Sequence, residues 1–284
     1  MRLAFFASAA MHPFSLPILI LFVLVGSLAG FLAGLMGIGG GIILIPLFLW
    51  SFKVAGFSPD IIVHAAFGTS LAIIIPTAVS STLGHRKRGN VEWRQVSLMA
   101  CGGVFGVLAG SSLAAGLPGD VLKGLFGLMQ IGSGLKMFRH QSHLPPEEVV
   151  GIPTRWLLLT GFVVGTFSAF FGVGGGIVAV PMMVILLRQP IHLAVGNSSA
   201  LMVISAIAGS ISYVVHGWRL PQLPPFSLGY VNQLVAVIIA PLTIVFARLG
   251  VRLASRTDHA KLMKTFAGFL ICTGAYMALG LFFR

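Results

Sequence analysis

Two glycine-rich segments hold the residues of this sequence best suited to binding chemistry. Gly39-Gly40-Gly41 and Gly174-Gly175-Gly176 each precede a short apolar run. A glycine costs about 1 kcal/mol relative to alanine inside a helix, so each triplet predicts a break between helices. The first turn of the following helix presents unpaired N–H groups and the positive end of the helix dipole, and glycine lets an anion approach them closely. We therefore expect both triplets to bind an anionic substrate.

Neutral polar side chains follow each triplet. Thr69 and Ser70 stand in one half of the chain, and Asn197 and Ser198 stand in the other. Their hydroxyl and amide groups are suited to donate hydrogen bonds to the oxygens of an anion, so we predict that all four contribute to substrate binding. The alternative is that they pair with carbonyl groups of their own helix or join neighbouring helices.

Other kinds of site are disfavoured. The chain has six acidic residues, all in predicted loops or at segment ends: Asp60, Glu92, Asp120, Glu147, Glu148 and Asp258. Because pumps for cations often use a carboxylate inside the membrane, an anion is the better substrate. Cys101 and Cys272 lie in separate apolar stretches without metal-ligand spacing, so we expect no metal site, no disulfide framework and no cofactor.

The composition indicates the environment in which these residues lie. Of 284 residues, 57% are hydrophobic and 8% are charged, and the mean hydropathy is +1.00. These values exclude an ordinary soluble fold and leave room for about eight to ten membrane segments. The net charge of +12 is then a topology signal in a lipid bilayer, and a nucleic-acid partner is not expected.

Ten apolar segments are predicted, five on each side of a polar linker. The linker begins at His140 and includes Pro145, Pro146, Glu147 and Glu148, so we divide the chain into membrane repeats at 1–140 and 141–284. The segments cover about 15–36, 42–52, 61–83, 93–115, 121–139, 155–171, 177–187, 192–215, 228–247 and 260–282. Met1–Ala10 is interpreted as an N-terminal tail. The segments after the glycine triplets are too short to cross a bilayer, so we expect re-entrant or broken helices.

The two halves repeat one another. Gly30, Gly37, Gly39, Gly40, Gly41, Ile42 and Pro46 recur 135 positions later as Gly165, Gly172, Gly174, Gly175, Gly176, Ile177 and Pro181, while Gly34 is matched by Ala169. Gly68-Thr69-Ser70 recurs 128 positions later as Gly196-Asn197-Ser198. A duplication explains this common order. Close helix packing is the alternative role for glycines, and we expect it for Gly26, Gly30 and Gly34, which are spaced by four.

The repeats are expected to have opposite orientations. If the 85–94 loop is cytoplasmic and every segment crosses, 13 of the 18 basic residues fall on the cytoplasmic side. Five segments is an odd number, so the second half enters from the opposite face. The predicted fold is an all-α polytopic membrane protein made of two inverted-topology repeats, an architecture that recurs in secondary transporters.

The paired motif Gly-x-Gly-Gly-Gly-Ile-x-x-x-Pro, followed by Gly-Thr-Ser or Gly-Asn-Ser, resembles the sulfite exporter TauE/SafE family of membrane permeases. The resemblance covers nearly the whole chain. It implies a multi-pass protein of the bacterial inner membrane that carries a small sulfur-containing anion, such as sulfite or an organosulfonate, and works as an exporter by alternating access. The second half has Asn197 where the first has Thr69, so a shared site would be chemically unequal.

Three alternatives remain open at the level of sequence. One is an importer or facilitator of another anion or of a thiol compound. The second is a membrane-embedded redox or sulfur-transfer enzyme that uses Cys101 or Cys272, and the third is an assembly subunit without a substrate. Proton coupling through a histidine is also compatible with the sequence. The oligomeric state is open, and a homodimer is one arrangement that fits.

Overall fold

The computed structural model is almost entirely helical. It describes residues 16–36, 40–139, 152–218, 220–221, 223–254 and 259–279. The predicted tail Met1–Ala10, the linker that begins at His140, and Gly39 lie outside the described residues.

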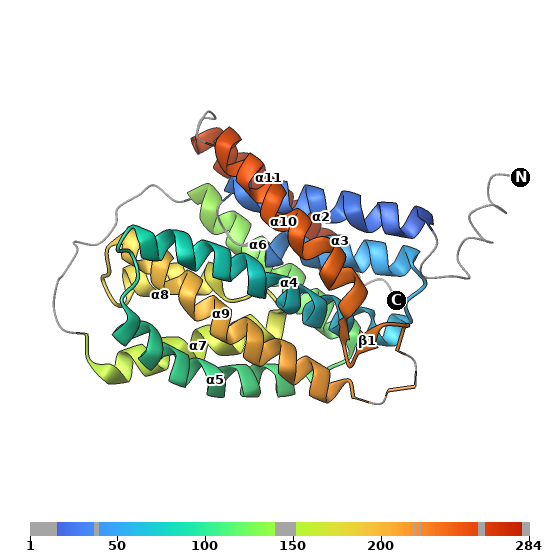
Figure 1. The fold of residues 1–284 in the computed structure, drawn as a ribbon, viewed down its shortest axis with the longest axis horizontal. Helices are drawn as coiled ribbons and strands as arrows, with labels where there is room; N and C mark the ends of the chain where they lie inside the picture. Colours follow the sequence, from blue (N-terminus) through green and yellow to red (C-terminus); the bar gives the residue numbers. More distant parts are fainter. Residues whose placement is uncertain are drawn as a thin grey trace, which may run out of the picture.

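Ten helices and one short hairpin make up the described part of the chain (Figure 1). They are α2 (Leu16–Met36), α3 (Gly41–Val54), α4 (Pro59–Lys87), α5 (Trp93–Ala115), α6 (Gly119–Arg139), α7 (Thr154–Phe171), α8 (Gly176–Ile185), α9 (Ile191–His216), β1 (Ser227–Leu228), β2 (Val231–Asn232), α10 (Gln233–Ala254) and α11 (His259–Leu279). The predicted all-α membrane fold is therefore confirmed.

One predicted boundary is wrong. The ninth segment was expected to begin near residue 228, but β1 and β2 form an antiparallel hairpin there, and α10 begins at Gln233. The hairpin turns at Gly229, whose φ of +57° lies in the left-handed region that glycine adopts readily. Asn232 then caps the new helix, because its side-chain oxygen accepts the Val235 N–H at 3.0 Å.

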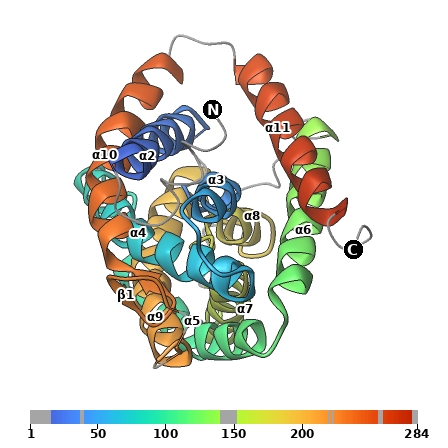
Figure 2. The same ribbon diagram turned by 90° about the vertical axis from the view of Figure 1, so that its right-hand side faces the viewer.

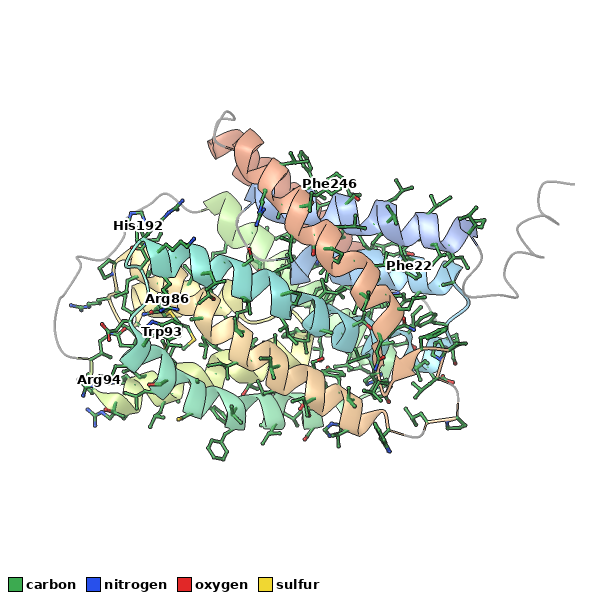
Figure 3. All side chains as sticks on the ribbon, viewed as in Figure 1. Phe22, Arg86, Trp93, Arg94, His192 and Phe246 are labelled. Atoms are coloured by element: carbon green, nitrogen blue, oxygen red, sulfur yellow. The ribbon has the colours of Figure 1, made fainter. Side chains whose placement is uncertain are left out.

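The two long helices α4 and α9 pack against each other in opposite directions. Near the start of α4, His64 stacks on Tyr230, which in turn packs on Tyr213 near the end of α9. Toward the opposite end, the hydroxyl oxygens of Ser81 in α4 and Ser199 in α9 are 3.0 Å apart, and Arg86 and His192 both lie at that end of the bundle (Figure 3). Figure 2 shows the short helices α3 and α8 near the middle of the bundle, with longer helices around them.

Glycines set the closest helix contacts. A Cβ added to Gly30 of α2 would lie 2.5 Å from the Cα of Thr243 in α10, and one added to Gly165 of α7 would lie 2.9 Å from the Cα of Gly103 in α5. Gly30 and Gly165 are the repeated glycines, and their partners are themselves 140 positions apart. The packing role expected for Gly30 is therefore seen, and each pairing joins a helix of one half to a helix of the other.

The outer surface is apolar. Within the residues that the structure describes, four helices, α4, α5, α7 and α9, are long and apolar enough to cross a membrane by length and composition. Large hydrophobic side chains are exposed on the outside of the bundle, among them Leu24, Phe105, Leu159 and Val237. A multi-pass protein of the bacterial inner membrane is consistent with this surface. Arg86 and Arg94 lie at the same end of the bundle (Figure 3), and the cytoplasmic position of the 85–94 loop stays a prediction.

Candidate functional site

The two glycine breaks meet in the interior. A Cβ added to Gly41, the first residue of α3, would lie 2.6 Å from the Cα and 2.8 Å from the carbonyl oxygen of Val173. Val173 is buried within the second break, between α7 and α8. Only glycine at position 41 lets the start of α3 approach the other break so closely. The two breaks therefore come together through Gly41 and Val173.

The second break takes its shape from three glycines in left-handed conformations. Gly172, Gly174 and Gly175 have φ values of +65°, +75° and +83°. Gly172 ends α7, with its N–H bonded to the carbonyl of Ser168, and Gly175 caps α8. The N–H groups of Gly176 and Ile177, the first two residues of α8, precede the first hydrogen bonds of that helix, which run from Val178 and Ala179 to the carbonyl of Gly175.

Helices α4 and α9 face this break from two sides. A Cβ on Gly174 would lie 3.0 Å from the Cγ2 of Ile74 in α4 and 3.0 Å from the Cγ of Met202 in α9. Ile74 and Met202 are 128 positions apart, so they are equivalent residues of the two halves. Gly174 thus lies between equivalent positions of α4 and α9.

Ser70 and Ser198 lie one helical turn before Ile74 and Met202. Residues four apart share a helix face, so both serines lie on the faces turned toward the break. Phe67, another residue of that α4 face, contacts Gly172. Both serine side chains are buried, and neither hydroxyl has a hydrogen-bond partner in the described structure. Buried hydroxyls are normally paired, so these two equivalent unpaired serines, which lie one turn from Gly174 in opposite directions, are candidate substrate contacts on either side of the break.

Thr69 and Asn197 are buried too, but their polar groups have other partners. The Asn232 N–H donates to Thr69 Oγ1 at 3.0 Å, and the Glu92 N–H donates to Asn197 Oδ1 at 2.8 Å. Asn232 directly precedes α10 and Glu92 directly precedes α5. The two bonds therefore relate equivalent residues, since Asn232 and Glu92 are 140 positions apart.

These bonds belong to two closures at opposite ends of α4 and α9. We call the first the hairpin closure, formed by Thr69, Tyr230 and Asn232. The second, the amide closure, is formed by Glu92, Gln95, Gln189 and Asn197. In it, the Gln189 side chain donates to Gln95 Oε1 at 2.7 Å and the Asn197 side chain donates to the same oxygen at 3.2 Å. The role of Thr69 and Asn197 as substrate ligands stays a prediction.

Two further buried residues lie at the breaks, although the sequence motifs did not identify them. Gln130 of α6 is fully buried and donates to the Ile42 carbonyl at 3.0 Å. That carbonyl has no helical partner because Pro46, four residues on, lacks an N–H. The sequence feature that could have identified Gln130 is a single amide side chain within an otherwise apolar segment. Ser168, four residues before Gly172, is also buried with an unpaired hydroxyl.

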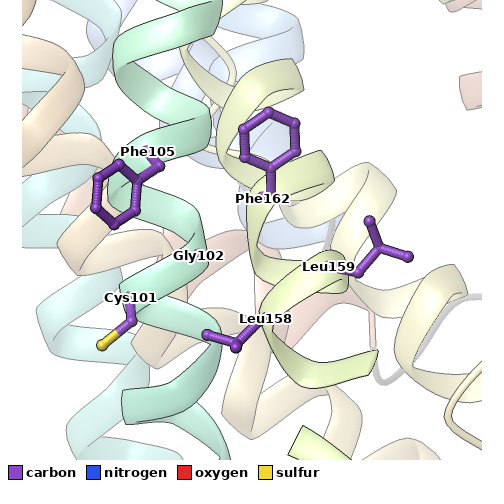
Figure 4. Close-up of a pocket in the computed structure, with 6 residues that line it drawn as sticks. All are labelled: Cys101, Gly102, Phe105, Leu158, Leu159 and Phe162. Atoms are coloured by element: carbon purple, nitrogen blue, oxygen red, sulfur yellow. The ribbon is translucent and has the colours of Figure 1, made fainter. Parts of the chain in front are cut away.

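A pocket on the outside of the bundle has a different character. It has a volume of about 430 Å³ and lies between α5 and α7 (Figure 4), lined by Cys101, Gly102, Phe105, Leu158, Leu159 and Phe162. The lining has no charged group, and Phe105 and Phe162 are exposed as on the rest of the apolar surface. Such a hollow suits lipid chains rather than an anion. Within the described ranges, no cluster of three His, Cys, Asp or Glu residues is placed to hold a metal ion.

Comparison with known proteins agrees with this architecture. The model of the sulfite exporter TauE/SafE family matches residues 22–277. A probable membrane transporter protein of Haemophilus influenzae is 29% identical over 272 residues, which are 92% of this chain and 98% of that protein. One of Methanocaldococcus jannaschii is 29% identical over 262 residues, covering 91% and 95%, and one of Xylella fastidiosa is 30% identical over 257 residues, covering 89% and 92%. No solved structure matches the chain.

Proposed function

Because the chain belongs to the sulfite exporter TauE/SafE family, it is a membrane transporter, and we propose that it carries a small sulfur-containing anion such as sulfite or an organosulfonate. The direction that we propose is export across the bacterial inner membrane.

One observation carries the choice of an anion. The buried hydroxyls of Ser70 and Ser198 have no partner, and each lies one helical turn before a residue, Ile74 or Met202, that packs against Gly174 of the glycine break. Hydroxyls and first-turn N–H groups are donors, and both suit a group with several negatively charged oxygens. The Gly174–Gly176 segment supplies the amides, and in the first half Gly39–Gly41 has the corresponding place in the sequence.

The surroundings of the break add no opposing charge. Asp60, Glu92 and Asp120 are exposed and lie at or near helix ends. A carboxylate beside the serines would repel an anion, and none of the described acidic residues is buried there. A compact sulfur oxyanion therefore fits this environment better than a cation does.

We propose that transport proceeds by alternating access between two inverted repeats. Three features support this mechanism: equivalent helices form equivalent contacts, α4 and α9 run in opposite directions, and the two closures contain bonds between equivalent residues. Both closures are formed and both central serines are buried, which is the arrangement expected of an occluded state. Opening one closure at a time would expose the break to one side of the membrane.

The proposal is tested by flux into proteoliposomes. Labelled sulfite and sulfoacetate are supplied, with chloride, sulfate and thiosulfate as competitors and an imposed pH gradient as a variable. Saturable uptake of a sulfur anion, inhibited by thiosulfate more than by chloride, is the expected result. Flux from each side of oriented vesicles distinguishes an exporter from an importer. Well-inserted protein that moves none of these anions would overturn the proposal.

A further inference from the structure

Ser168 of α7 differs from most buried hydroxyl residues of this bundle. A serine or threonine inside a helix commonly donates to the carbonyl four residues back. Thr82, Ser111 and Ser199 do so, at 2.7, 2.7 and 2.9 Å. Ser168 is fully buried, yet its hydroxyl has no hydrogen-bond partner in the described structure. An unpaired buried hydroxyl is unfavourable, so its retention requires an explanation.

The backbone holds Ser168 rigidly beside the second break. Its carbonyl oxygen accepts hydrogen bonds from the N–H groups of Gly172 and Val173, the latter at 3.2 Å. On the other side of the break, a Cβ added to Gly175 would lie 3.2 Å from the Cβ of Ser168. The side chain therefore stands next to the residue that caps α8.

The repeated fold does not need this hydroxyl. The position equivalent to Ser168, 135 residues earlier, is Ala33, which has no polar group. Since the same α-helical segment forms in both halves, the hydroxyl is an addition specific to the second break. In contrast, Ser70 and Ser198 are equivalent residues, so both halves have a serine at that position.

We propose that Ser168 is a substrate-binding residue that determines specificity, and that it donates a hydrogen bond to an anion bound at the start of α8. This inference rests on the proposed function, because it requires an anionic substrate at the second break. The N–H groups of Gly176 and Ile177, which precede the first hydrogen bonds of α8, add further donors beside this hydroxyl. A hydroxyl with neighbouring amide donors suits an oxyanion, such as sulfite or a sulfonate, better than a monatomic halide.

The test uses full-length protein and two readouts. KM and maximal rate for labelled sulfite are measured in proteoliposomes, and the rise in Tm caused by sulfite is measured in detergent. Ser168→Ala and Ser168→Thr are compared with wild type. Ser111→Ala is the matched control, because Ser111 is an equally buried helix serine whose hydroxyl is bonded to Val107 and lies 2.6 Å from that of Ser212.

Loss of one hydrogen bond to a charged group predicts that S168A raises the KM for sulfite about 10- to 100-fold. The maximal rate should change much less, and S168T should restore most of the affinity. The Tm of S168A without sulfite should equal or exceed that of wild type, because the hydroxyl has no partner to lose, while the Tm rise with sulfite should be reduced. S111A should keep the wild-type KM.

Two negative outcomes are distinguishable. If wild type transports sulfite and S168A shows an unchanged KM and an unchanged sulfite-dependent Tm rise, the assignment of Ser168 is wrong and the proposed function stands. A fall in the Tm of S168A without sulfite, again with unchanged KM, would likewise overturn the assignment by showing a purely structural role. If wild type neither transports nor is stabilised by any sulfur anion, the proposed function fails, and the inference fails with it.

Discussion

The two glycine breaks begin equivalent half-helices in the same way but are built differently. In both, the capping glycine carbonyl accepts the N–H groups three and four residues on: Gly40 from Ile43 and Leu44, and Gly175 from Val178 and Ala179. Gly40, however, has φ −68°, an ordinary helical value, whereas Gly175 has φ +83°. The second break therefore depends on glycine conformation at its cap, and the first does not.

The prolines in the two half-helices lead to a second difference between the breaks. Pro46 frees the carbonyl of Ile42, and Gln130 of α6 binds that carbonyl from outside. Pro181 equally removes the N–H that would pair with Ile177. Lys123 and Gly127 of α6 recur 141 positions later as Lys264 and Gly268, and at the same offset Gln130 is matched by Ile271 of α11. The first half-helix is thus tied to its surroundings by a buried side chain that the second half lacks.

Together these contrasts indicate that the two breaks have different roles. At the first break, Gln130 donates a hydrogen bond to the Ile42 carbonyl, and Gly41 packs against Val173. The second has three glycines in left-handed conformations and carries the extra hydroxyl of Ser168. We infer that the first break acts mainly as a support and the second as the main substrate-contacting element.

The largest expected effect distinguishes the two capping glycines. Gly175→Ala should reduce sulfite flux to background, because a left-handed φ costs a non-glycine residue about 1–2 kcal/mol and the new Cβ would lie 2.9 Å from Val164. Gly40→Ala should retain most of the flux, since its φ suits alanine. Uptake in proteoliposomes measures both, and Gly132→Ala, at a position with open space, is the control. Equal loss in G40A and G175A would contradict the proposed asymmetry.

A second prediction concerns the lock on the first half-helix. Gln130→Leu leaves the buried Ile42 carbonyl unpaired, so the free energy of unfolding should fall by about 1–3 kcal/mol. Thermal or denaturant unfolding in detergent measures this change. Met129→Leu, a volume-conserving change at the neighbouring position, should alter stability much less. A Q130L variant as stable as wild type would show that the Gln130 bond does not hold α3.

A third prediction compares the two closures. Asn197→Ala removes the acceptor of the Glu92 N–H and the donor to Gln95, so we expect it to lower stability by about 1–2 kcal/mol. Thr69→Val removes a single acceptor and keeps its shape, so its effect should be smaller. The same unfolding measurement ranks the two variants. A larger loss in T69V would reverse the order and identify the hairpin closure as the stronger one.

The smallest effect is expected at the cysteines. Both are free and exposed, on α5 and α11. A Cys101→Ser and Cys272→Ser double variant should transport sulfite within about twofold of wild type, because the transport mechanism uses no thiol. Loss of activity in this variant, with normal insertion, would support the redox or sulfur-transfer alternative.

Much of the fold was predictable because apolar segment length and glycine breaks act locally. The ten expected segments correspond to the ten described helices, and the short helices α3 and α8 follow the two glycine triplets. The expected packing of Gly30 and the approach of the two breaks are also seen. The hairpin at Ser227–Asn232 was missed, since its apolar residues read equally well as the start of a helix.

The candidate site was less predictable, because hydrogen-bond partners depend on residues far apart in the chain. Thr69 and Ser70 are adjacent in one motif, yet Thr69 bonds to Asn232 while Ser70 is unpaired. Ser198 matches Ser70, but Asn197 is engaged by the segment before α5. Sequence spacing does not distinguish the paired residues from the unpaired ones, because each hydrogen bond depends on which helix packs against which face.

By itself, the sequence determined a helical membrane protein with two related halves, because hydrophobic length, glycine cost and proline placement act within single segments. Only the tertiary structure decided that Gly175 is left-handed while Gly40 is helical, and that Ser70, Ser168 and Ser198 are buried without partners. These properties arise from contacts between α3, α4, α7, α8 and α9. Such contacts form when the helices pack, and the pattern within each segment does not contain them.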